Sequence, residues 1–384
     1  FEIQTVISSL ALRNDLQPDF LSWGDVADCW LELLRNFDDT DDEHAKQHIK
    51  LFIANALSNA KRVEECIDYC DQITEEEFVK SALLISVKTL SISHRFGEAI
   101  QRMKLLAKKM KSKEDKEEEK PLDLDVEAES KKYQTDFDIE AAHIALEDLY
   151  KIMEPIGVKP FLVSGTLLGY ARNNKFLPHD KDIDVGVFAN VDKLKIFEEI
   201  FKSGKFILDC DSLTRDPLYT IAVTHIQKGI CIDIFFYYDR EDKYVTGVNY
   251  DWKFDKCFAF SKFDIKKVTF SGIEAYIPED YELNLAENFG PEWREEDKNY
   301  ISHLESPSGV AKGSEIYMLL LWIHLVQSIN KGSKEKLKKV WDLSQNYSDN
   351  ELAPTREYFE DFISLPAAEG DNRLTSKKEL SYAI

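Results

Sequence analysis

The stretch that decides the fold is Gly165–Val187, which reads GTLLGYARNNKFLPHDKDIDVGV. Its first part predicts a turn and a helix through Arg172, because small residues precede apolar residues at helical spacing. Its last part predicts a β-strand that carries Asp182 and Asp184 close behind Asp180. Alternate residues of a strand point to one face, so Asp182 and Asp184 should project together.

Two carboxylates on one face repel each other unless a cation lies between them, and hard oxygen ligands suit Mg²⁺ or Mn²⁺. A calcium-binding EF-hand loop is excluded, because Val185 stands where that loop needs Gly and Val191 stands where it needs Glu. A solvated acidic turn remains an alternative. The neighbouring Ile183 and Val187 indicate a buried face beside the carboxylates, which favours a binding role.

A third carboxylate, Asp233, is the one charge within the apolar run Ile230–Phe236. A lone aspartate in a buried strand is costly, so it needs a partner. That partner is either a Lys or Arg side chain or a metal ion shared with Asp182 and Asp184.

The tripeptide Ser164-Gly165-Thr166 precedes the predicted helix and forms a candidate binding site for a donor phosphate. Helix N-termini present free N–H groups, and glycine allows close approach of the backbone. Arg172 and His179 would supply positive charge nearby. An ordinary helix cap is the alternative interpretation.

Together with Cys231–Tyr238 (CIDIFFYY), the opening stretch resembles the LicD/fukutin family of phosphotransferases. Further on, Phe270–Pro278 and Asn288–Trp293 resemble the family's closing segment, a β pair followed by a helix that ends in a [YF]G..W motif. The resemblance covers about residues 137–300. It implies an α+β protein, with a nucleotidyltransferase-like mixed-sheet core flanked by helices.

The resemblance also implies an enzyme. The expected reaction moves a polyol phosphate, ribitol or glycerol phosphate, from a CDP-activated donor to a sugar or polyol hydroxyl and releases CMP. Surface-polysaccharide or capsule synthesis is the expected setting. The alternatives are phosphocholine transfer within the same family, nucleotidyl transfer that releases pyrophosphate, and an interaction protein without activity.

By match to the family's motifs, Asp182, Asp184 and Asp233 would bind Mg²⁺ or Mn²⁺, and Asp180 is a fourth catalytic candidate. Gly165 would belong to the turn that faces the phosphates. The extra zinc-binding cysteines of eukaryotic members are not evident, so no zinc is predicted.

The charge of the chain limits its partners. Acidic residues outnumber basic ones by 71 to 49, which gives a net charge of −22, so binding of nucleic acid through general electrostatics is not expected. The longest apolar run, Ile316–Val326, contains His324 and is far shorter than the ~20 residues of a membrane-spanning helix. We therefore expect no transmembrane segment and a cytoplasmic location, or a peripheral one at the inner face of the membrane.

Composition and periodicity divide the chain into four parts. Residues 1–110 are predicted to form an α-helical, tetratricopeptide-like domain, which is the candidate surface for a protein partner or for the rest of a larger chain. Residues 111–133 are a charged linker. Residues 134–310 would be the LicD-like catalytic domain, and residues 311–384 a helical extension whose last helix is expected at about 355–364.

Overall fold

The computed structural model describes a large part of the chain, and the statements below concern that part. The described ranges are 22–37, 42–111, 137–178, 180–208, 215–250 and 254–364. The predicted linker 111–133 lies outside them, apart from Lys111 at the end of a helix, and so does His179.

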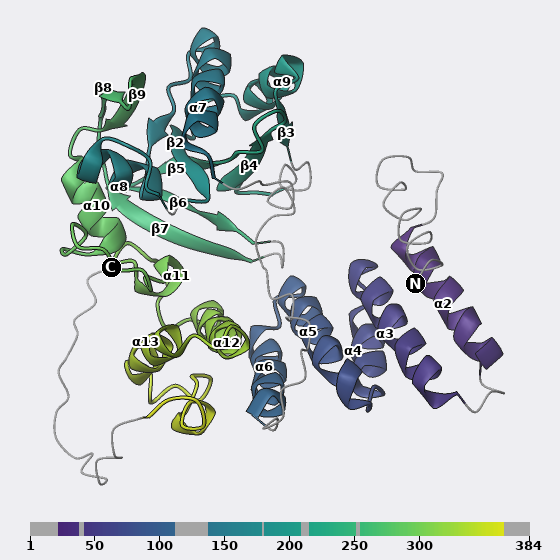
Figure 1. The fold of residues 1–384 in the computed structure, drawn as a ribbon. Helices are drawn as coiled ribbons and strands as arrows, with labels where there is room; N and C mark the ends of the chain where they lie inside the picture. Colours follow the sequence, from purple (N-terminus) through teal and green to yellow (C-terminus); the bar gives the residue numbers. More distant parts are fainter. Residues whose placement is uncertain are drawn as a thin grey trace.

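The described residues up to Lys111 form helices, as predicted, and these helices lie side by side in a row (Figure 1). Buried apolar residues such as Ile53 and Leu57 fill the space between the first of these helices. The helices are α2 (Trp23–Phe37), α3 (Glu43–Asn59), α4 (Val63–Asp71), α5 (Glu76–Ile92) and α6 (Phe96–Lys111).

The second part contains a nine-stranded mixed sheet with the main order β3-β4-β5-β2-β1-β9-β8, while β6 pairs with both β5 and β7. The pairs β2–β5 and β1–β9 are parallel, and the other recorded pairs are antiparallel. The strands are β1 (Phe161–Leu162), β2 (Asp182–Phe188), β3 (Phe206–Leu208), β4 (Thr220–His225), β5 (Cys231–Arg240), β6 (Lys243–Asn249), β7 (Asp255–Ser261), β8 (Ile265–Phe270) and β9 (Ile273–Pro278). The predicted α+β class is confirmed.

The two central strands have two different faces. On one face Ile183 and Val185 of β2, with Ile232 and Ile234 of β5, join a core with apolar residues of α7 (Ile139–Met153) and α9 (Lys193–Ser203). These two helices cover that face of the sheet (Figure 1). Because side chains alternate along a strand, the aspartates of β2 and β5 emerge on the opposite face.

The long β6–β7 hairpin was missed by the sequence analysis. It continues from the end of β5, and its residues Tyr250 and Phe254 reach the core of the C-terminal helices. The predicted helix at 355–364 is wrong: the structure has only the short 3₁₀ helix η4 (Arg356–Tyr358), followed by turns.

The C-terminal helices share one core with the N-terminal helices. Helix α12 (Glu315–Asn330) lies against α6, and both contribute to one buried cluster with α5 and α13 (Lys334–Gln345). Figure 1 shows α12 between α13 and α6. In the described part of the chain, no helix combines the length and apolar character that crossing a membrane would need.

A buried ion pair fixes α7 to the sheet edge. The Asp148 carboxylate accepts hydrogen bonds from Lys205 Nζ at 2.7 Å and His225 Nε2 at 3.2 Å. Burial alone would raise the pKa of Asp148, but the bonds from Lys205 and His225 outweigh it and leave the pKa lowered. Asp148 therefore stabilises the folded chain in its charged form.

We predict that Asp148→Asn lowers the free energy of unfolding at neutral pH by about 1–3 kcal/mol, because it removes the charge that accepts hydrogen bonds from the buried His225 and the half-exposed Lys205. A lowered carboxyl pKa contributes stability above its unfolded value of about 3.9, and the contribution disappears as pH falls through the folded value. Urea unfolding at neutral and at successively lower pH should therefore show the two proteins converging.

The matched control is Glu147→Gln, which removes the neighbouring exposed pair with Lys151. Exposed pairs contribute little, so this variant should unfold like the wild type. A difference between Asp148→Asn and the wild type that stays constant with pH would contradict the assignment.

Candidate active site

A cavity of about 350 Å³ lies on the carboxylate face of β2 and β5. Asp182, Asp184 and Asp233 all line it, so the structure brings together the three aspartates that the sequence analysis singled out. Asp184 and Asp233 are direct partners in the parallel β2–β5 register. Side chains of register partners on neighbouring strands lie close together, and a cation shared by the carboxylates stays a prediction.

The turn before α8 (Ser164–Asn173) positions Asp184. The backbone N–H of Gly165 donates a hydrogen bond to Asp184 Oδ2 at 2.9 Å, and the N–H of Asp184 donates to Thr166 Oγ1 at 2.9 Å. A methyl group on Gly165 would lie 3.2 Å from Asp184 Oδ2 and 3.5 Å from Asp180 Oδ1. Glycine is needed here because the backbone approaches two carboxylates closely.

Ser164 begins α8 in a conformation that is costly for a residue with a side chain, with φ of 45°. It lines the cavity, and its hydroxyl accepts a long hydrogen bond of 3.4 Å from Asn288 Nδ2. Asn288, at the end of α10 (Tyr281–Phe289), is itself a lining residue that the sequence analysis did not assign to the site. Its place in the NFGPEW motif was the signal that could have identified it.

Three other predicted residues have different surroundings. Thr166 is fully buried and does not reach the described wall of the cavity. Arg172 Nη2 donates to the backbone carbonyls of Trp293 and Glu295, at 2.7 and 2.6 Å. Asp180 Oδ2 accepts from the N–H of Leu177 at 2.7 Å, while its Oδ1 faces Gly165. The phosphate-binding roles of Thr166 and Arg172 and the catalytic role of Asp180 stay predictions, as does the role of His179, which is outside the described residues.

Aromatic side chains form much of the remaining wall, and they come from β5, β7, α10 and the segment that precedes α11 (Ser302–Glu305). They are Phe235, Tyr237, Phe258, Phe260, Phe289 and Tyr300. Burial, and secondarily Asp184, raises the pKa of Tyr237, so its phenol stays neutral. The cavity thus combines a carboxylate floor with walls on which a planar ring or a polyol could pack.

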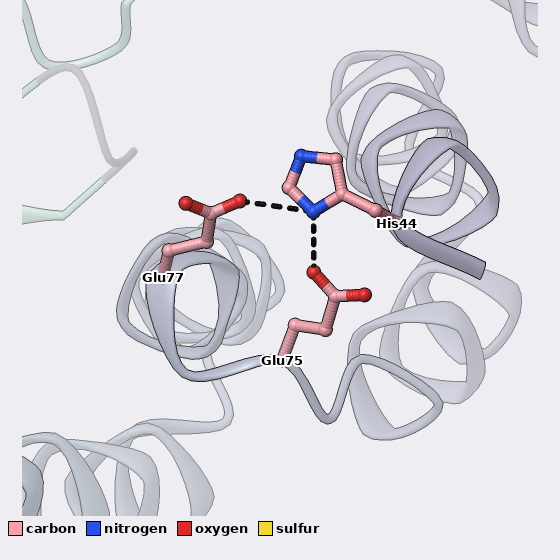
Figure 2. A group of neighbouring side chains, drawn as sticks. All are labelled: His44, Glu75 and Glu77. Atoms are coloured by element: carbon pink, nitrogen blue, oxygen red, sulfur yellow. Dashed lines mark hydrogen bonds and ion pairs between the residues drawn. The ribbon is translucent and has the colours of Figure 1, made fainter. Parts of the chain in front are cut away.

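One group of side chains in the described part of the chain has three potential metal-ligand atoms within 4.8 Å of one another: His44, Glu75 and Glu77. Figure 2 shows His44 Nδ1 between the two carboxylates, at 2.7 Å from Glu75 and 3.2 Å from Glu77. The hydrogen bond to Glu75 raises the pKa of His44. The three side chains are largely exposed and connect α3 to the start of α5. An ion pair between these two helices is enough to explain why they lie together.

The three aspartates of the cavity do not form such a close group of ligand atoms. Mg²⁺ is usually bound through one or two carboxylates together with water and substrate phosphates, rather than in a cage made only of protein. An open set of carboxylates at the floor of a cavity, including Asp233 at 9% exposure, therefore fits Mg²⁺ or Mn²⁺ that arrives with a phosphate-bearing substrate.

Comparison with known proteins gives a partial match. Residues 157–280 match the family described as LicD/FKTN/FKRP, nucleotidyltransferase domain. This range holds all nine strands and the three aspartates, whereas Asn288 and Tyr300 of the cavity wall lie beyond it.

Similar proteins also match only part of the chain. An uncharacterized protein of Rickettsia typhi is 28% identical over 148 residues, which is 38% of this chain and 45% of that protein. The ribitol-5-phosphate transferase FKTN of Homo sapiens is 26% identical over 172 residues, which is 43% of this chain and 37% of that protein. The chain thus spans about half or less of the length of these relatives. The resemblance to the LicD/fukutin family is confirmed for residues 157–280, which match the model of the LicD/FKTN/FKRP nucleotidyltransferase domain.

Proposed function

We propose that the chain is a metal-dependent transferase that moves a polyol phosphate from a CDP-activated donor to a sugar or polyol hydroxyl and releases CMP. The observation that carries this proposal is the meeting of Asp182, Asp184 and Asp233 at the floor of one cavity within the matched domain. The similarity to a ribitol-5-phosphate transferase supports the choice of donor class, with ribitol or glycerol phosphate as the group transferred and capsule assembly as the setting.

Different residues of the cavity would bind the metal ion, position a carboxylate and contact the donor. The aspartates would hold Mg²⁺ or Mn²⁺, which when bound neutralises the donor diphosphate and orients the displacement. The N–H of Gly165 holds Asp184 in place, so the carboxylate does not have to be ordered when substrate arrives. The aromatic wall offers a surface for the cytosine ring and excludes water from the reacting groups.

The experiment that tests the function is a donor screen. The full chain is incubated with CDP-ribitol, CDP-glycerol or CDP-choline, a polyol or sugar acceptor, and Mn²⁺ or Mg²⁺, and CMP is measured. Metal-dependent CMP release with a CDP-polyol is expected. Release with CDP-choline alone would assign phosphocholine transfer, pyrophosphate release from CTP would assign nucleotidyl transfer, and no turnover of any donor would refute the proposal.

Asp184→Asn and Asp182→Asn should each lower turnover by on the order of 100-fold or more, because an amide does not replace the charge that holds the metal and opposes the developing phosphate charge. Circular dichroism should show an unchanged fold. The control is Asp239→Asn, which removes an exposed carboxylate paired with Lys262 outside the cavity and should keep wild-type turnover. Full activity in both cavity variants would disprove the assignment.

Asp233→Asn tests the partner of the buried aspartate. A metal bound only to the folded chain stabilises it by about 2.7 kcal/mol at a hundredfold excess over its dissociation constant. Mn²⁺ should therefore raise the melting temperature of the wild type relative to EDTA, and Asp233→Asn should lose most of that increment. Asp239→Asn, on the same strand, should retain it. Equal destabilisation of Asp233→Asn in both buffers would instead indicate a role in the fold alone.

Gly165→Ala tests the close approach of the turn to the carboxylates. The added methyl group must displace Asp184 Oδ2 by a few tenths of an ångström, and misplacement on this scale is expected to lower turnover by about tenfold or more. The matched control is Gly97→Ala, which is also at the second position of a helix. There the added methyl group would lie 3.6 Å from its nearest neighbour, an oxygen of Glu315. Both variants should keep their melting temperature, and only Gly165→Ala should lose activity; similar activities would count against the positioning role.

A further inference from the structure

A second, smaller cavity of about 150 Å³ adjoins the candidate active site. Tyr300, Ser302 and His303 line both cavities, so one layer of side chains separates them. The opposite wall is formed by the C-terminal half of α12 and the start of α13. These helices lie outside the matched family domain, so nothing in that match assigns a role to the cavity.

The second cavity is basic, although the chain as a whole carries a net charge of −22. Lys331 and Lys336 line it, and none of its lining residues is an aspartate or glutamate. Within the described residues, neither lysine takes part in a recorded ion pair, whereas the nearby Lys339 is paired with Asp297 and Glu305. Lys339 is thus neutralised by its ion pairs, whereas the two lining lysines are exposed and no ion pair with another described residue neutralises them.

The electrostatics at His324, on the wall of the same cavity, agree with this distribution. Burial lowers the pKa of His324 to about 3, and the nearby His303, Lys336 and Lys331 act in the same direction. Burial is the larger cause of the lowered pKa, and the smaller contribution of the two lysines has the sign of a positive local potential, which attracts an anion.

The cavity also offers hydrogen-bond donors. Ser333 is the N-cap residue of α13, and its hydroxyl makes no capping hydrogen bond. It lines the cavity with Lys336, at the positive end of a twelve-residue helix. The small volume suits a compact group and not a nucleotide, for which pockets of several hundred Å³ are typical.

We propose that this second cavity binds a phosphate group, carried by the acceptor whose hydroxyl reacts in the larger cavity. Lysines act as point charges toward phosphate, and hydroxyl and backbone donors complete its hydrogen bonds. The claim that an acceptor carries the phosphate rests on the proposed transferase function. The claim that the cavity binds phosphate does not depend on that function. The donor diphosphate is placed elsewhere, at the aspartates.

The first experiment measures binding of inorganic phosphate to the full chain by calorimetry, in EDTA and at constant ionic strength. Without metal the aspartate cavity repels phosphate, so binding reports the second cavity. Lys336→Gln should weaken binding by about tenfold or more, since it removes a charge-assisted contact. The control Lys338→Gln makes the same change on the same helix but at a different cavity, and should bind like the wild type. Absence of phosphate binding, or equal weakening in both variants, would overturn the proposal.

The second experiment separates an acceptor phosphate from free phosphate. With a CDP-polyol donor and glycerol 3-phosphate as acceptor, Lys336→Gln should raise the KM for the acceptor by about tenfold, and Lys338→Gln should not. A KM that is unchanged in Lys336→Gln, although phosphate binding is lost, would overturn the acceptor assignment. If no donor is turned over while phosphate binding still depends on Lys336, the transferase function fails and the anion site stands.

Discussion

The candidate active site depends on the parallel, in-register pairing of β2 with β5. This pairing sets Asp184 directly beside Asp233 and at the same time sets Ile183 beside Ile232 on the other face. Because alternate residues face opposite sides, the burial of the isoleucines against α7 and α9 is what forces the carboxylates together into one cavity. A slip of one residue in the register would bury the carboxylates under the helices, so the core selects the geometry of the site.

Local patterns predicted the parts of the chain whose neighbours lie close in sequence. The alternation of Asp182 and Asp184 with apolar residues identified one strand, and the lone charge in Ile230–Phe236 identified the next. The contribution of His303 to the cavity could not be predicted, because it depends on contacts with Tyr250 that span more than fifty positions. The place of Arg172 was equally hidden, since backbone carbonyls far along the chain hold its guanidinium group. The helix predicted at 355–364 is absent from the structure, so apolar residues at helical spacing were not sufficient evidence for a helix there.

The cavity is built from two sources. Its carboxylate floor and part of its aromatic wall lie in the matched domain, and the rest of the wall comes from Asn288, Tyr300 and the helix that carries His303. Helix α11 and the residue before it, Ile301, rest on α12, which is packed in turn on α6. The part of the cavity inside the matched range and the part beyond it therefore have different structural supports.

Helix α7 determines how much of the chain could fold without the rest. It ends at Met153, before the matched range begins, yet its residues Leu146 and Leu149 cover the apolar face of the sheet. A segment cut at the limits of the match would expose that face to water, and burial of such side chains is the main force that stabilises a domain. The portion that is recognisable by descent is thus smaller than the portion that can fold. A fragment designed to fold on its own must therefore begin before α7 and not at the first matched residue.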